Sequence, residues 1–312
     1  MACRNVLIFA NPVAGRGRAG AIAAELTSAL RAAGWNAMPV LTPPSTTVLP
    51  EQAVGAAIAI GGDGTLRAVV SRLATPPDRP VGPRSPSDPW VDPPPIVIVP
   101  MGTANLMHQS LGLPKRPADL SRHVLELLTR GRVVRRDVSL ANGELFLIVA
   151  GAGLDGEVIH TLHAVRNGPI TLGSYVMPTL RSLAGWRFPR IDVWADGRHV
   201  FGPQPGMAMV GNVREHGLGF SFLSRAVPDD GWMDLLAFTC RSVGHAVDRF
   251  LETATDQLIG ADGVVYLRAR HVEVRSEAAV AVQADGEAAG FTPLSVELLP
   301  RQVRFLTLPE NA

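Results

Sequence analysis

This sequence of 312 residues contains almost no lysine, little cysteine and no long hydrophobic run. Among its 29 lysine and arginine residues, Lys115 is the single lysine. A Walker A loop is absent, as are the V-A-I-K lysine and the H-R-D loop of protein kinases, which excludes these two classes of protein. The two cysteines, Cys3 and Cys240, form no C-x-x-C pair, and so few cysteines are typical of a reducing compartment.

The apolar runs all fall well short of 18 residues, so we expect no membrane-spanning helix. The first run, residues 6–10, is too short for a signal peptide, and we therefore expect a cytoplasmic protein. A net charge of +1 provides no field for a nucleic-acid partner, so none is expected. With 46% hydrophobic residues, the chain is long and apolar enough for two domains.

Residues 1–135 alternate short apolar runs with segments of helical spacing. The runs that we predict to be strands are residues 6–10, 37–41, 56–60 and 96–99. The predicted helices are residues 19–33, 65–73, 101–111 and 117–129. Because the runs are continuous, they favour an α/β domain with a parallel sheet and helices on both faces. Nine prolines lie within residues 76–95, which predicts an extended surface insertion.

From residue 136 the pattern changes to short strands joined by turns. Asn142-Gly143 and Asp196-Gly197 each stand between apolar runs, which predicts two-residue hairpins. Further predicted strands are residues 207–210, 233–238, 264–267, 272–274, 280–283 and 294–299, and the predicted helices are residues 154–166, 172–183 and 243–258. We therefore expect a β-rich, antiparallel, sandwich-like domain over residues 136–312, whose last segment can return to the first domain.

Three glycine-containing loops follow predicted strands of the first domain. They are Asn11-Pro-Val-Ala-Gly15, Gly61-Gly-Asp-Gly-Thr65 and Pro100-Met-Gly-Thr-Ala-Asn105. Glycine lets a ligand approach the backbone closely, and the N-terminus of a helix offers N–H groups to an anion. Because the carboxyl ends of parallel strands meet at one edge, the loops predict a nucleotide site. The alternative is a tight turn in which Asp63 is only a helix N-cap.

In order and spacing these motifs resemble the bacterial diacylglycerol kinase-like lipid kinases, a family that also includes sphingosine kinases and shares its fold with NAD kinases. The resemblance continues through Leu111-Gly-Leu-Pro114, Gly151-Ala-Gly153, residues 226–234 and Asp285-Gly-Glu287. It implies the fold of that family and a kinase that transfers the γ-phosphoryl group of ATP, with Mg²⁺, to the hydroxyl of a lipid alcohol. Diacylglycerol is the first acceptor that it implies.

The resemblance also assigns residues to these roles. Those that it assigns to ATP are Asn11, Gly15, Thr42, Gly61, Gly62, Asp63, Gly64, Thr65, Leu66, Arg67, Gly102, Thr103 and Asn105. It makes Glu287 the general base and Asp63 a second catalytic carboxylate. It places a magnesium ion on the side chain of Asp230 and the main-chain oxygens of Val227 and Trp232. The Asp285-Gly286 pair also fits a plain hairpin turn, and such a turn can present Glu287.

One residue departs from the family pattern. Where the family commonly has aspartate after the asparagine of the third loop, this chain has Leu106. Three alternatives therefore stay open: another lipid acceptor such as a sphingosine-type base, an NAD kinase-like enzyme, and a non-catalytic nucleotide- or lipid-binding homologue. The expected partners are the lipid alcohol and the inner surface of a membrane, which the protein would meet from the cytoplasm. A homodimer stays open as well.

Overall fold

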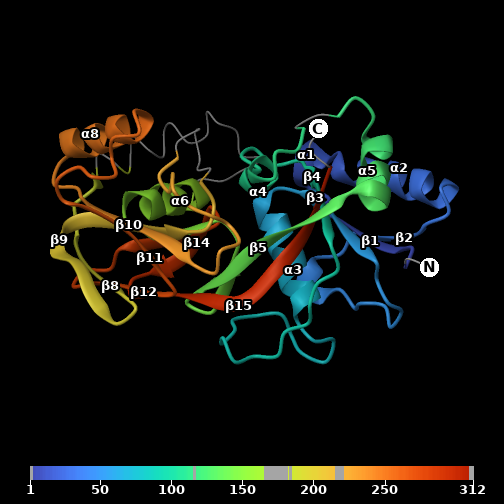
Figure 1. The fold of residues 1–312 in the computed structure, drawn as a ribbon, viewed down its shortest axis with the longest axis horizontal. Helices are drawn as coiled ribbons and strands as arrows, with labels where there is room; N and C mark the ends of the chain where they lie inside the picture. Colours follow the sequence, from blue (N-terminus) through green and yellow to red (C-terminus); the bar gives the residue numbers. More distant parts are fainter. Residues whose placement is uncertain (1–2, 115–116, 165–181, 183–184, 215–220, 309–312) are drawn as a thin grey trace. The chain divides into compact units, whose positions relative to one another are not determined.

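Figure 1 shows the fold in a computed structural model, which describes residues 3–114, 117–164, 182, 185–214 and 221–308. The chain forms two compact units. Unit 1 comprises residues 1–82, 87–136 and 302–312, and unit 2 comprises residues 83–86 and 137–301. The chain enters unit 2 within strand β5 (Arg132–Ala141) and leaves it within strand β15 (Leu294–Thr307).

Unit 1 is built on a parallel sheet, as predicted. Its strands are β1 (Asn5–Ala10), β2 (Asn36–Val40), β3 (Ala56–Gly61) and β4 (Ile96–Pro100). They lie in the order β4-β3-β1-β2, and the end of β15 joins β4 in parallel, where Phe305 pairs with Ile96. The helical segments are α1 (Ala14–Gly17), α2 (Ala19–Ala32), η1 (Pro44–Thr46), α3 (Asp63–Ala74), α4 (Leu106–Ser110) and α5 (Leu120–Arg130).

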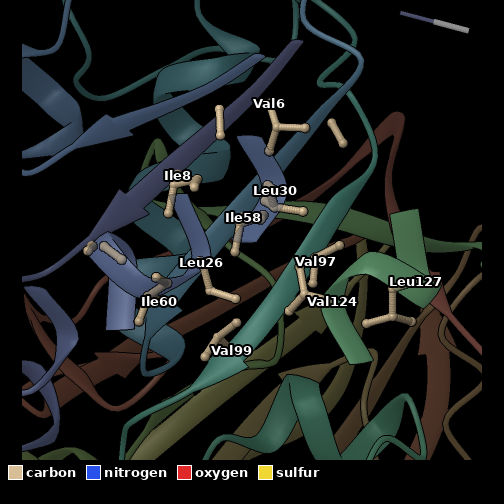
Figure 2. Close-up of a cluster of buried hydrophobic side chains, with 14 of the residues drawn as sticks. Val6, Ile8, Leu26, Leu30, Ile58, Ile60, Val97, Val99, Val124 and Leu127 are labelled. Atoms are coloured by element: carbon tan, nitrogen blue, oxygen red, sulfur yellow. The ribbon is translucent and has the colours of Figure 1, made fainter. Parts of the chain in front are cut away.

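One core of unit 1 lies between the sheet and two helices. Alternate residues of β1, β3 and β4 supply the sheet side, and α2 and α5 supply the other side (Figure 2). The labelled members are Val6, Ile8, Leu26, Leu30, Ile58, Ile60, Val97, Val99, Val124 and Leu127. Burying one such leucine or isoleucine contributes about 1.5–3 kcal/mol. The intervening residues of β3 are buried as well, which explains why the strands have no polar alternation.

The helix predicted over residues 101–111 is wrong in its first half. Helix α4 begins only at Leu106, because its N-cap Asn105 has left-handed backbone angles (φ 50°, ψ 50°). Residues 101–105 are therefore a loop that follows β4. The insertion over residues 76–95 contains no helix or strand, and backbone bonds such as Val91 N–H to the Ala74 carbonyl (3.0 Å) hold it in place.

Unit 2 is antiparallel in all of its strand pairings that the structure describes. Besides parts of β5 and β15, its strands are β6 (Glu144–Phe146), β7 (Val149–Ala152), β8 (Arg190–Ala195), β9 (Arg198–Gly211), β10 (Met233–Thr239), β11 (Val264–Ala269), β12 (His271–Ser276), β13 (Ala281–Ala284) and β14 (Glu287–Phe291). The first half of β9 pairs with β8, and its second half pairs with β7 and β10. One long strand is thus shared between two sheets, which confirms the predicted sandwich-like architecture.

Helices α6 (Leu154–Ala164) and α8 (Val243–Ala254) complete the described part of unit 2. Both predicted hairpins are present: φ is 49° at Asn142 and 84° at Gly143, and 47° at Asp196 and 78° at Gly197. The helix predicted over residues 172–183 lies outside the described residues except for Ser182. Among the helices that the structure describes, none combines the length and the apolar character needed to cross a membrane.

Candidate active site

The three glycine loops of unit 1 contact one another at the carboxyl ends of β1, β3 and β4. The Met101 N–H donates to the Gly61 carbonyl at 2.8 Å. A Cβ atom on Gly102 would lie 2.7 Å from the Cα of Gly62, and one on Gly15 would lie 2.0 Å from the Cε of Met101. The loops after β3 and β4 therefore meet backbone to backbone, which only glycine permits. The structure brings the three predicted motifs together.

Asn11 and Thr65 link the first two loops. The Asn11 Nδ2 lies 3.5 Å from the Thr65 Oγ1, and the Asn11 Oδ1 accepts the Val13 N–H at 3.2 Å. A Cβ atom on Gly61 would lie only 2.4 Å from the Thr65 Oγ1, so the threonine side chain folds back over this glycine. The hydroxyl of Thr65 is thus held at the junction of the loops after β1 and β3.

Helix α3 begins at this junction. Its N-cap is Gly62, which has no side chain, and no other described side chain caps it. The first N–H groups of a helix have no partner within the helix and carry a partial positive charge. Gly64 and Thr65 lie in this first turn and Thr103 is exposed in the neighbouring loop, so the backbone here can receive a phosphate.

Asp63 joins two helix N-termini. Its Oδ2 accepts the Leu106 N–H at 3.0 Å and its Oδ1 accepts the Met107 N–H at 3.1 Å. The alternative in which Asp63 is the N-cap of its own helix is wrong, since Asp63 caps α4 instead. Burial raises the pKa of the Asp63 carboxyl, and these backbone hydrogen bonds oppose the rise. Leu106 keeps this contact despite its departure from the family pattern, because only its backbone takes part.

Asn105 closes the third loop. Its Oδ1 accepts the Gly102 N–H at 2.9 Å, and its Nδ2 donates to the Gly102 carbonyl at 2.8 Å. Gln109, which the sequence analysis did not select, donates to the Ala104 carbonyl from the following helix. These bonds fix the loop before any ligand is present.

Three predicted ATP residues lie apart from this junction or add nothing to its surface. The side chain of Leu66 is 2% exposed and belongs to the core. Thr42 follows β2, and its Oγ1 lies 2.9 Å from the Thr47 Oγ1; none of its described contacts reaches the glycine loops. Arg67 lies on α3 behind the first turn.

In unit 2, Asp285 anchors the turn that precedes Glu287. Asp285 and Gly286 have φ values of 51° and 76°, so the hairpin interpretation is confirmed. The Asp285 Oδ2 accepts the Leu147 N–H at 2.9 Å, and its Oδ1 accepts the N–H groups of Ile148 at 2.9 Å and Val149 at 3.2 Å. Glu287, the predicted general base, is the half-buried first residue of β14.

Gln283, which the sequence analysis missed, braces the same turn from the other side. Its side chain is 2% exposed. Its Nε2 donates to the Asp155 Oδ2 at 2.8 Å, and its Oε1 accepts the Gly286 N–H at 2.9 Å. Asp155 lies in the first turn of α6, directly after the Gly151-Ala-Gly153 motif. No local pattern distinguishes this buried glutamine from an exposed one.

The predicted metal ligands lie at the start of β10. The Asp230 Oδ1 accepts the Trp232 N–H at 3.0 Å, and its Oδ2 is 3.0 Å from the Nη1 of Arg268. Asp234 is buried, which raises the pKa of its carboxyl, and the charge of Asp230 adds to this. Across the described residues there is no group of three or more His, Cys, Asp or Glu side chains arranged to hold a metal ion.

Comparison with known proteins places this geometry in a family. Residues 5–141 match the diacylglycerol kinase catalytic domain, and residues 148–307 match the YegS C-terminal NAD kinase beta sandwich-like domain. A Pseudomonas fluorescens Pf-5 protein named "Probable lipid kinase YegS-like" is 28% identical over 295 residues, which cover 91% of this chain and 89% of that protein. A Bacillus subtilis 168 protein named "Diacylglycerol kinase" is 25% identical over 263 residues, covering 82% of this chain and 78% of its own.

The fold is also found among solved structures. A crystal structure described as a diacylglycerol kinase from Bacillus anthracis str. Sterne has a TM-score of 0.63 at 22% identity and covers 98% of this chain and 97% of its own. Another structure from that organism has a TM-score of 0.71 at 23% identity and covers 97% of both chains. The chain therefore belongs to the diacylglycerol kinase-like family of lipid kinases, which are ATP-using phosphotransferases with an alcohol acceptor.

Proposed function

We propose that this chain transfers the γ-phosphoryl group of ATP to the hydroxyl of diacylglycerol. The observation that supports this most is the backbone-to-backbone contact of Gly62 with Gly102 beside the start of α3. Such a surface offers N–H groups rather than side chains, which suits a chain with one lysine. The relative named as a diacylglycerol kinase supports this choice of acceptor.

The glycine loops of unit 1 would bind the phosphates of ATP. In phosphoryl transfer the protein mainly positions the reactants and neutralises charge. Backbone N–H groups of Gly64, Thr65 and Thr103 would supply donors, with Arg16 as an exposed cation beside the first loop. Mg²⁺ bound with ATP would neutralise charge on the transferred group. Asp63 would hold α4 against α3, so that the two phosphate-binding loops keep their spacing.

Glu287 of unit 2 would act as the general base. Its carboxylate takes the proton of the lipid hydroxyl while that oxygen attacks the γ-phosphorus and ADP leaves. The turn before it is fixed by Asp285 and Gln283, so the residue that follows has a defined position. Because the acceptor resides in a bilayer, we also propose that the protein works at the cytoplasmic surface of a membrane.

The test is transfer of label from γ-labelled ATP to lipid vesicles that contain diacylglycerol, with a sphingosine-type base and NAD in parallel reactions. We expect labelled diacylglycerol. Glu287→Gln should lower the rate by at least about 10²-fold, while Glu277→Gln, on an exposed loop residue, should leave it unchanged.

Other outcomes identify the alternatives. Label in NAD alone would mean an NAD kinase-like enzyme, and label in the sphingosine-type base alone would mean a different lipid acceptor. Binding of ATP without turnover, not restored by Leu106→Asp, would mean a non-catalytic homologue. An unchanged rate in Glu287→Gln would refute the role of this residue.

A further inference from the structure

The loop of residues 226–232, here called the Asp230 loop, carries all three metal ligands that the family resemblance implies. Both oxygens of the Asp230 side chain already have a donor: Oδ1 accepts the Trp232 N–H at 3.0 Å, and Oδ2 pairs with the Arg268 Nη1 at 3.0 Å. Arg268 lies on β11, which pairs with β10 directly after the loop (Figure 1). A guanidinium thus sits against the carboxylate that a cation would need.

The main-chain oxygens of the Asp230 loop are also occupied. The Ala226 carbonyl accepts the Arg214 Nε at 2.8 Å, and the Gly231 carbonyl accepts the Arg270 Nε at 3.2 Å. With its amide oriented so that the nitrogen faces acceptors, Asn212 donates to the Trp232 carbonyl at 3.2 Å. Trp232 is one of the implied metal ligands, so its oxygen already has a partner.

Asp137, which is buried, braces the same loop from β5. Its N–H donates to the Pro228 carbonyl at 2.8 Å, and its Oδ2 accepts the Gly231 N–H at 2.7 Å. The Asp230 loop is therefore tied on both sides by groups of the protein itself.

The local charge also opposes a divalent cation. Arg268 and Arg270 both stack on the Trp232 ring, with their guanidinium carbons 5.8 and 4.4 Å from its centroid. Magnesium requires near-octahedral oxygen ligands at about 2.0–2.1 Å. Here the oxygens face N–H donors and positive charge, so the residues present do not fit the ion.

We propose that the guanidinium of Arg268 takes the place of a divalent cation at Asp230, so that the Asp230 loop keeps its conformation without metal. A planar guanidinium can donate to a carboxylate and stack on an aromatic ring at the same time, as Arg268 does here. The inference concerns unit 2 alone and does not depend on the acceptor that the kinase uses.

The experiment measures Mn²⁺ binding to the full chain by electron paramagnetic resonance, without nucleotide, together with thermal melting in EDTA or Mg²⁺. We expect the wild-type protein to bind no Mn²⁺ through Asp230 and to melt at the same temperature in both solutions. Arg268→Gln frees the Asp230 Oδ2, so this variant should melt lower in EDTA, bind one Mn²⁺ and recover in Mg²⁺. Adding Asp230→Asn should abolish that recovery.

Arg275→Gln is the matched control. Arg275 pairs with Glu273, lies 5.6 Å from the Trp194 centroid and is 57% exposed, as is Arg268. This variant should gain no Mn²⁺ site. Wild-type Mn²⁺ binding that disappears in Asp230→Asn would overturn the proposal. So would an Arg268→Gln variant that binds no Mn²⁺ and melts alike in EDTA and Mg²⁺.

Discussion

Replacing Asp285 by asparagine isolates the carboxylate that anchors the turn before Glu287. Asparagine has the same shape and tolerates the left-handed backbone angle (φ 51°), so the turn itself should persist. The amide oxygen can keep the two N–H groups that Oδ1 now accepts. The amide nitrogen, however, would face the Leu147 N–H, which the Oδ2 now accepts at 2.9 Å.

The cost follows from these three bonds. A hydrogen bond to an ionised acceptor contributes about 1.5–3 kcal/mol and a neutral one about 0.5–1.5 kcal/mol, and a buried donor left without a partner costs about 1–3 kcal/mol. The site is only part-buried, and water recovers some of this. We therefore expect Asp285→Asn to lower the free energy of unfolding by about 2–4 kcal/mol.

Asp196→Asn is the matched control for urea unfolding of the two variants. Asp196 occupies the same position of a hairpin turn, with φ 47°, but both of its backbone donors, from Arg270 and His271, reach the single atom Oδ1. Asparagine keeps that oxygen, so this variant should lose about 1 kcal/mol or less. Equal losses in the two variants, or a loss below about 0.5 kcal/mol in Asp285→Asn, would refute the reasoning.

Two further substitutions test the contacts around the proposed site. Gly102→Ala should raise the Kd for ATP at least about tenfold, because its Cβ would lie 2.7 Å from the Gly62 Cα and push the two loops apart; Gly82→Ala, with no atom within 4 Å of the added Cβ, should not change it. Isothermal titration distinguishes these outcomes, and equal affinities would contradict the role of close approach. Gln283→Leu should lower kcat more than it raises the KM for ATP, since it leaves Asp155 and the Gly286 N–H without their shared partner; Gln283→Glu should restore less than full activity, and an unchanged kcat would mean that the turn needs no brace.

Local sequence patterns sufficed for most of the elements. The continuous apolar runs of β1, β3 and β4 predicted a sheet buried on both faces, because such strands have no polar face to expose. Asn142-Gly143 and Asp196-Gly197 predicted their turns, because few other residues tolerate two successive positive φ angles. The helix over residues 101–111 was wrong where Asn105 adopts a left-handed conformation, since apolar spacing does not reveal the backbone angles of a loop.

The site shows a similar division. The glycine motifs, read with the order of the strands, predicted that three loops would meet, because parallel strands end at one edge of their sheet. Which partner each charged or polar side chain finds depended on the packing of distant segments. Asp63 meets an N–H group 43 residues away, Asp230 meets an arginine 38 residues away, and Gln283 meets Asp155 across 128 residues. Short-range periodicity carries no record of such pairs, so the sequence alone determined where the functional segments lie, and only strand register and packing decided what their carboxylates hold.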